Sequence, residues 1–89
     1  MPGQMDERRR EPRFPASGRV EIFFEDPLPV SVEAELMDTS ASGFRISHES
    51  RLLVPGLEVR LQRDGALRKA RVMWTHLLDG RSVSGCLLL

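Results

Sequence analysis

Apolar and polar residues alternate along most of the chain with a period of two. The alternating apolar positions are Val20, Ile22 and Phe24, then Val32, Ala34 and Leu36, then Phe44 and Ile46, and finally Leu57, Val59 and Leu61. Such alternation is typical of a β-strand with one buried face. No segment keeps the period of 3.6 residues that an amphipathic helix shows. The pattern therefore predicts an all-β fold, in which the second strand ends at Asp38.

Turn signals separate the alternating stretches. They stand at Pro55-Gly56, Asp64-Gly65 and Asp79-Gly80. Asp-Gly between two alternating runs is a strong signal for a two-residue hairpin. The runs LRKARVMW (67–74) and RSVSGCLLL (81–89) bring the total to about six short strands, as in small sandwiches and barrels. Because closure hides sheet edges, we expect a six-stranded antiparallel β-barrel over residues 16–89.

The first fifteen residues have a different character. They are polar and charged, and prolines at positions 2, 12 and 15 discourage both helix and strand. Residues 1–15 are therefore predicted to be a flexible arm. Four arginines crowd into six positions of this arm: Arg8, Arg9, Arg10 and Arg13. Taken alone, such a run is equally well a solvated basic tail.

Composition narrows the class of protein. With 89 residues, 40% of them hydrophobic and 29% charged, the chain is expected to fold as one domain. Thirteen basic and thirteen acidic residues cancel, which gives no support for binding a nucleic-acid polymer. One cysteine and two scattered histidines predict neither a disulfide framework nor a metal site. No apolar run predicts membrane insertion, so a cytoplasmic protein is expected.

The segment DTSASG, residues 38–43, lies between two alternating stretches. These residue types are common in turns, and a turn alone would explain them. A carboxylate such as Asp38 also accepts hydrogen bonds from the N1–H and amino group of guanine, and a hydroxyl such as Ser40 bonds a phosphate or base. Arginine complements both groups, because its guanidinium matches phosphate oxygens and the O6/N7 edge of guanine.

Together these motifs resemble the PilZ domain, a family that binds the bacterial second messenger cyclic di-GMP. R-x-x-x-R at Arg9 and Arg13 is followed, after two strands, by D-x-S-x-x-G from Asp38 to Gly43. The stretches ARVMW and VSGCLLL are similar to the late strands of the family. The resemblance implies that Arg9 and Arg13 hold guanine and phosphate groups. Asp38 and Ser40 would contact a guanine and its neighbouring phosphate, and Gly43 would shape the turn.

The resemblance also implies secondary ligand residues. An arginine at the place of Arg8 tends to accompany a stacked pair of cyclic di-GMP molecules in this family. Further candidates are Arg10, Ser42, Arg45 and Trp74. Arg45 is predicted to be a solvated strand-face residue, with a ligand phosphate as the alternative partner. Trp74 follows Ala70 and Val72 and is predicted to lie in the core, with base stacking as the alternative.

The resemblance implies a receptor without catalytic activity, metal or further cofactor. Ligand binding would order the arm and signal to a protein partner, in processes such as motility, attachment in biofilms and exopolysaccharide output. Many family members carry a helix after the barrel, and no such helix is predicted before Leu89.

Two other classes of protein share part of the pattern. ELMDTSASG also looks like the strand and turn of a retroviral-type aspartic protease, in which Asp38 would pair with its twin in a dimer. That interpretation leaves the arginine arm without a role. An arginine-arm adaptor for nucleic acid or protein is the third class, and zero net charge argues against it.

Overall fold

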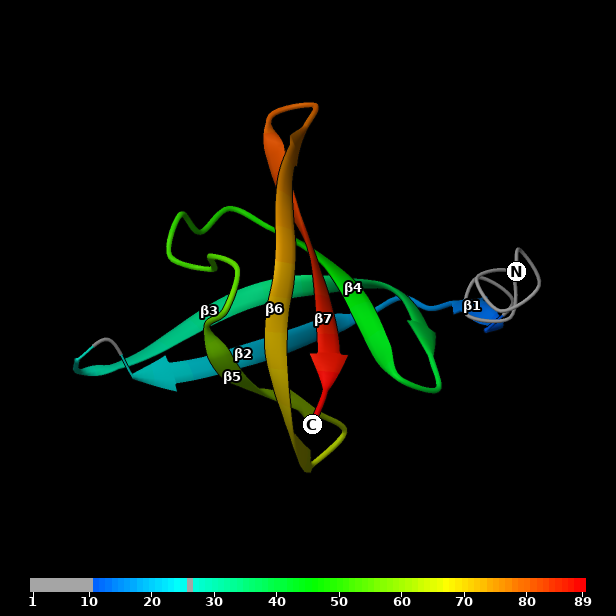
Figure 1. Cartoon of the computed structure of the whole chain (residues 1–89), viewed down its shortest axis with the longest axis horizontal. Coiled ribbons are helices and arrows are strands. Elements are labelled where there is room, and N and C mark those ends of the chain that lie inside the picture. The colour runs from blue at the N-terminus through cyan, green and yellow to red at the C-terminus, as the bar shows by residue number, and fades with distance from the viewer. Residues whose placement is uncertain (1–10, 26) are drawn as a thin grey trace, which may run out of the picture.

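The computed structural model describes residues 11–25 and 27–89, and these residues form seven strands (Figure 1). The strands are β1 (Arg13–Pro15), β2 (Arg19–Glu25), β3 (Pro29–Ser40), β4 (Gly43–His48), β5 (Glu58–Arg63), β6 (Ala66–Leu78) and β7 (Arg81–Leu88). The described part of the chain contains no helix, and hence no helix long and apolar enough to cross a membrane.

Six of the strands close into a barrel. Their order is β3, β2, β5, β6, β7 and β4, and β4 pairs with β3 to complete the circle. Every pairing is antiparallel. The predicted all-β fold with a six-stranded antiparallel barrel is confirmed. Closure leaves each of these strands hydrogen-bonded on both sides, which removes exposed sheet edges.

The alternating apolar residues fill the barrel. Its core consists of Val20, Ile22, Phe24, Ala34, Leu36, Phe44, Ile46, Leu53, Val59, Leu61, Ala70, Val72 and Cys86. Full burial of a valine, leucine, isoleucine or phenylalanine side chain contributes about 1.5–3 kcal/mol to the free energy of folding. Cys86 behaves as the small apolar residue that was predicted, and burial raises the pKa of its thiol to about 12.

The two predicted Asp-Gly hairpins are present. Asp64 and Gly65 join β5 to β6, and Asp79 and Gly80 join β6 to β7. All four residues have positive φ, which a two-residue turn of type I′ requires at both of its central positions. The β6–β7 hairpin is long and projects beyond the rest of the barrel (Figure 1).

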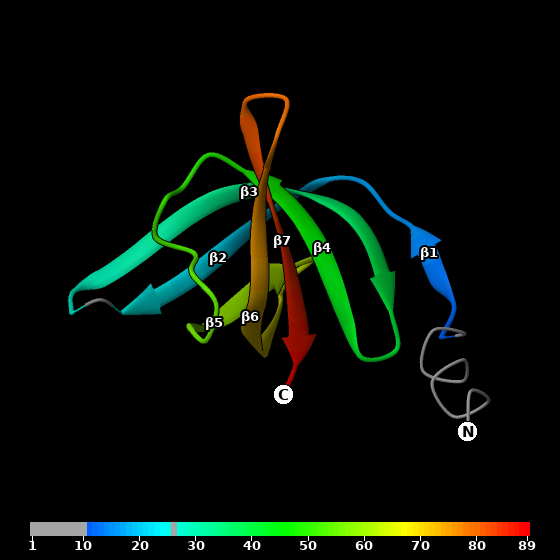
Figure 2. The ribbon, with the colours of Figure 1, turned by 45° about the horizontal axis from the view of Figure 1, so that its top comes forward.

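The prediction of a strand-free arm over residues 1–15 is wrong at its end. Arg13–Pro15 forms β1, which pairs with Asp38–Ser40 of β3. Figure 2 shows β1 beside the end of β3. Pro15 is compatible with this strand because β1 is an edge strand, so a missing N–H breaks no central ladder. Arg8, Arg9 and Arg10 lie outside the described residues.

The predicted end of the second strand at Asp38 is also wrong, since β3 continues to Ser40. The extension is stable because backbone groups find partners on both sides, with Pro15 opposite Asp38 in β1 and Arg45 opposite Asp38 in β4. Only Ala41 and Ser42 remain to connect β3 to β4. Four of the six residues of the segment DTSASG therefore lie in strands, and Ala41 and Ser42 form the turn.

Two β-bulges interrupt the alternation. The register of β3 against β4 shifts by one residue between Leu36 and Asp38, and that of β6 against β7 shifts between Val72 and Trp74. A bulge inserts one residue, so the side chains beyond it change faces. Leu36 and Val72 point into the core, whereas Asp38 and Trp74 lie on the outer face.

Candidate functional site

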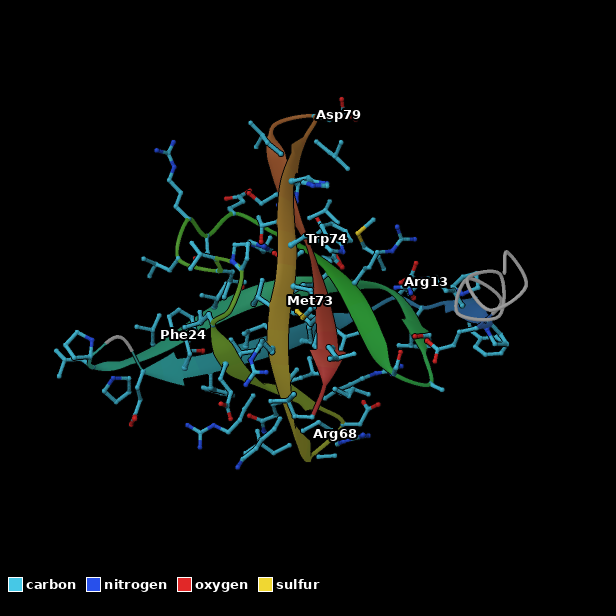
Figure 3. The ribbon with its side chains drawn as sticks, viewed as in Figure 1. Arg13, Phe24, Arg68, Met73, Trp74 and Asp79 are labelled. Carbon is cyan, nitrogen blue, oxygen red and sulfur yellow. The ribbon has the colours of Figure 1, made fainter. Side chains whose placement is uncertain are left out.

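One row of residues crosses four strands on the outer face of the barrel. Asp38 of β3 lies opposite Arg45 of β4, Arg45 lies opposite Gly85 of β7, and Gly85 lies opposite Trp74 of β6. The row thus runs from a carboxylate through a guanidinium and a bare backbone to an indole ring. Figure 3 shows Trp74 on β6 and Arg13 close to β1, towards the other end of the row.

Two arginines hold the Asp38 carboxylate. Nη2 of Arg13 donates to Oδ1 at 3.1 Å, and Nε of Arg45 donates to Oδ2 at 2.8 Å. Nη2 of Arg45 donates to Oδ2 as well. The Asp38 side chain is only 10% exposed, whereas the two arginine side chains are about 40% exposed. The cluster is therefore a nearly buried acid under two partly solvated cations.

This arrangement changes the acidity of Asp38. The hydrogen bonds from Arg45 lower the pKa of Asp38 below its ordinary value of 3.8, burial opposes this effect, and the hydrogen bond from Arg13 adds to it. Bonds to the ionised form of a carboxyl group favour that form. Asp38 is consequently a carboxylate at neutral pH. Arg45, predicted to be a solvated strand-face residue, is instead the main partner of this carboxylate.

Ser42, in the turn between β3 and β4, connects the barrel to Glu11, which precedes β1. Oγ of Ser42 donates to Oε1 of Glu11 at 2.6 Å, and this bond is the main cause that lowers the pKa of Glu11. Oγ of Ser40 donates to the carbonyl oxygen of Gly43 at 3.4 Å, a long and weak bond. Sequence reasoning gave Glu11 no role, because nothing in its neighbourhood along the chain indicates the contact with Ser42.

Gly43 is required for a reason other than the predicted one. It does not adopt positive φ, and it is the first residue of β4 rather than part of the turn. A Cβ on Gly43 would overlap the backbone carbonyl of Cys86 in β7. Glycine therefore permits the close approach of β4 and β7 below the site, in accord with its use where backbones meet.

Trp74 lies on the surface of the barrel, so the prediction that it belongs to the core is wrong. The bulge before it moves its side chain from the inner to the outer face. Its ring covers Gly85, since a Cβ there would overlap the indole. His76 stacks on it, with ring centroids 4.9 Å apart and planes inclined by 28°. Trp74 is half-buried, and a flat aromatic surface of this kind stacks well on a nucleotide base.

Arg13, Arg45 and Trp74 border a shallow cavity of about 380 Å³ on the outer face of the barrel. Its lining is Arg13, Ser40, Ser42, Gly43, Phe44, Arg45, Met73, Trp74, Gly85, Cys86 and Leu87. The cavity falls within the ~300–1,000 Å³ range that is usual for ligand pockets. It combines two guanidinium groups, two hydroxyls and an indole, which suits a ligand with phosphates and a flat base.

Comparison with known families agrees with this chemistry. The sequence model of the PilZ domain matches residues 7–87. The chain belongs to the PilZ domain family. A search of curated proteins found no match. PilZ domains bind cyclic di-GMP and are not a known enzyme family, so membership supports a cyclic di-GMP-binding receptor function in general.

The PilZ motifs converge in space where the structure describes them. Arg13 of the first motif contacts Asp38 of the second, and Ser40, Ser42 and Gly43 lie on the same cavity. Arg45 and Trp74 join them from β4 and β6. The alternating pattern gave no signal for Gly85, Met73 and Leu87 as lining residues. A glycine inside a strand, as at Gly85, is the one hint of a close approach.

The position and the partners of Asp38 differ from those expected for an aspartic protease. The resemblance to such a protease required an aspartate in the turn after a strand, where the carboxylate is free to share a proton with a twin. In this PilZ domain Asp38 lies inside β3 and is ion-paired with Arg13 and Arg45.

Proposed function

We propose that this PilZ domain is a receptor that binds cyclic di-GMP in the cavity on the outer face of β3, β4, β7 and β6. The observation that carries the proposal is the row from Asp38 to Trp74, with Arg13 placed against it by β1. It brings guanidinium groups that can bind phosphate and an indole that can stack on a base into one cavity, and Arg13 and Arg45 of its lining hold the Asp38 carboxylate beside it.

Each group has a distinct role in the proposed complex. Asp38 accepts hydrogen bonds from the Watson–Crick edge of a guanine, and Ser40 donates to the neighbouring phosphate. Arg13 binds phosphate or the O6/N7 edge of guanine. Trp74 supports a base by stacking, and the absence of a side chain at Gly85 keeps the ring flat against β7.

The arginines before β1 complete the site in this proposal. Arg9 precedes Arg13 by four positions and supplies the second guanidinium of the first motif. Arg8, with Arg10 as a further candidate, contacts a second nucleotide if the ligand binds as a stacked pair. A calorimetric stoichiometry near two nucleotides per chain would support this role of Arg8, and a stoichiometry near one would remove it.

The signal passes to a protein partner through the residues before β1. Glu11 bonds to Ser42, which lines the cavity, and this contact supports the proposal that ligand phosphates draw the arginines towards the barrel. Binding would change their conformation, a common type of switch. Hydrogen exchange of residues 1–12 measured with and without ligand tests this step. Equal protection in both states would refute the switch.

Calorimetric titration with cyclic di-GMP is the direct test of the receptor function. GTP and a linear guanine dinucleotide are the controls, because they share guanine and phosphate but not the cyclic backbone. We expect saturable binding of cyclic di-GMP and much weaker binding of both controls. Absence of heat, together with an unchanged Tm in the presence of the ligand, would refute the proposal.

A further inference from the structure

The two oxygens of Asp38 have different environments. Oδ2 accepts two bonds, from Nε and Nη2 of Arg45. Oδ1 accepts one bond, from Nη2 of Arg13. A carboxylate offers about four lone-pair sites, two on each oxygen. Within residues 11–25 and 27–89, Arg45 therefore saturates Oδ2, whereas Oδ1 keeps one acceptor site with Arg13 bound and two without it.

The two arginines are also anchored differently. Arg45 stands in β4, which pairs with β3 on one side and β7 on the other. Arg13 stands in β1, an edge strand of three residues that pairs, among the described strands, with β3 alone. Parts of a structure with few neighbours open at low free-energy cost. Of the two partners of Asp38, Arg13 is thus the one that can be exchanged.

We infer that Arg45 is a positioning residue that fixes the Asp38 carboxylate with Oδ1 available to guanine, while Arg13 exchanges its bond to Oδ1 for bonds to the ligand. This inference rests on the proposed function. Guanine presents two donors to Oδ1, its N1–H and its amino group. Adenine presents an acceptor at N1, which a fixed carboxylate oxygen repels. Arg45 thereby determines selectivity for guanine without contacting the base.

Arg81 offers a matched control for Arg45. Its Nε donates to Oγ of Ser47 at 2.9 Å, and its Nη1 donates to Oε2 of Glu49 at 2.8 Å. Its side chain is 43% exposed, close to the 40% of Arg45. Arg81 thus makes a comparable set of bonds next to β4, away from Asp38. Substitution of Arg81 therefore shows how removal of a partly exposed, hydrogen-bonded arginine changes the protein when Asp38 loses no partner.

The first measurement needs no ligand. The carboxyl carbon of Asp38 is titrated by NMR in the unaltered chain and in Arg45→Gln, Arg13→Gln and Arg81→Gln. We expect the titration midpoint of Asp38 to rise most in Arg45→Gln, less in Arg13→Gln and not at all in Arg81→Gln. If Arg45→Gln leaves the midpoint unchanged, or raises it less than Arg13→Gln does, the positioning role of Arg45 is refuted.

The second measurement compares cyclic di-GMP with cyclic di-AMP by calorimetry. Arg45→Gln should reduce the preference for the guanine nucleotide by about tenfold or more, the range expected when a charge-assisted hydrogen bond is lost. Arg13→Gln should weaken binding of both nucleotides, because both carry the phosphates that the Arg13 guanidinium can bind. Arg45→Lys keeps the charge but not the planar fork, so it should restore part of the preference. An equal loss for both nucleotides in Arg45→Gln would overturn the inference.

Failure of the inference is distinguishable from failure of the proposed function. If the unaltered chain binds no cyclic di-GMP, the proposed function fails and the selectivity part of the inference falls with it. The NMR titration then still decides whether Arg45 positions Asp38. If Arg45→Gln does not fold, as circular dichroism would show, Arg45→Lys takes its place in both measurements.

Discussion

The indole ring of Trp74 lies directly over Gly85, where any side chain would overlap it. These residues stand opposite each other on β6 and β7, immediately after the bulge in β6. The missing side chain at Gly85 therefore makes room for the indole ring of Trp74. The ring occupies the space above the β7 backbone.

Substitution of Gly85 tests this relationship. The three atoms nearest to a Cβ at Gly85 all belong to the Trp74 ring, a side chain that can rotate away, so Gly85→Ala should leave a folded barrel with a displaced indole. We expect cyclic di-GMP affinity to fall by about the 1–3 kcal/mol that one base-stacking contact provides. Calorimetry and the tryptophan emission spectrum are the measurements. An unchanged spectrum with unchanged affinity would contradict the stacking role.

Substitution of Gly43 should instead destabilise the barrel. A Cβ at Gly43 would meet the backbone carbonyl of Cys86, which cannot move without shifting β7. Gly43→Ala should therefore lower the free energy of unfolding by about 1–3 kcal/mol, the usual cost of overpacking. Urea denaturation measures the effect, with Gly85→Ala as the control at a neighbouring site. Equal stability of Gly43→Ala and the unaltered chain would show that β4 and β7 are not held this closely.

Replacement of Arg13 separates binding from folding. Arg13→Ala removes a bond to Asp38 from a side chain that is 43% exposed, so the loss of stability should stay within about 1 kcal/mol. Binding of cyclic di-GMP should weaken by about 1.5–3 kcal/mol. Arg63→Ala is the matched control, since Arg63 is 44% exposed and pairs with Asp64 at 3.6 Å. A loss of stability as large as the loss of binding would make Arg13 structural.

A buried chain of hydrogen bonds links four parts of the barrel. The backbone N–H of Ser50 donates to Nδ1 of His48, which leaves Nε2–H to donate to Oγ of Ser84 at 2.7 Å. Ser84 and Thr75 are joined at 2.6 Å, and Thr75 donates to the carbonyl of Leu53. Each group in this chain has a partner only while His48 is neutral. The sequence gave no role to His48.

The His48 chain predicts a pH-dependent stability. Burial, with a smaller effect of Arg81, lowers the pKa of His48 below its ordinary 6.5, so the unfolded chain binds a proton more readily than the folded one. Stability should be full above pH 6.5 and decrease as the pH falls from there towards the lowered pKa. The Tm between about pH 7.5 and about pH 5 is the measurement. His48→Gln should flatten this dependence, whereas His76→Gln on the surface should retain it.

Fluorescence offers a further check of the site. Trp74 is the only tryptophan, so its emission reports this cavity alone. Addition of cyclic di-GMP should change the emission with the same midpoint as the calorimetric titration, because the proposed complex stacks a base on the indole. An emission that stays constant through saturation would place the ligand elsewhere.

The sequence by itself determined the barrel and most of its core. Strict alternation at positions such as Ile22, Ile46 and Val59 leaves one face of each strand apolar, and burial of those faces needs no knowledge of distant contacts. Asp64-Gly65 and Asp79-Gly80 marked two hairpins, because positive φ is a local requirement. The motif residues from Arg9 to Gly43 likewise pointed to a guanine nucleotide, through the chemistry of arginine and aspartate together with the resemblance of the two motifs to those of the PilZ domain.

Tertiary structure alone decided which face of the barrel carries the site. Uninterrupted alternation would have placed Asp38 with Leu36 and Trp74 with Val72, inside the barrel. The bulges before Asp38 and Trp74 turn both outward and align them through Arg45 and Gly85. Whether a strand bulges depends on the register of its partner, and register is set by pairings between distant segments. The same dependence placed Arg13 in β1 and paired Arg45 with Asp38.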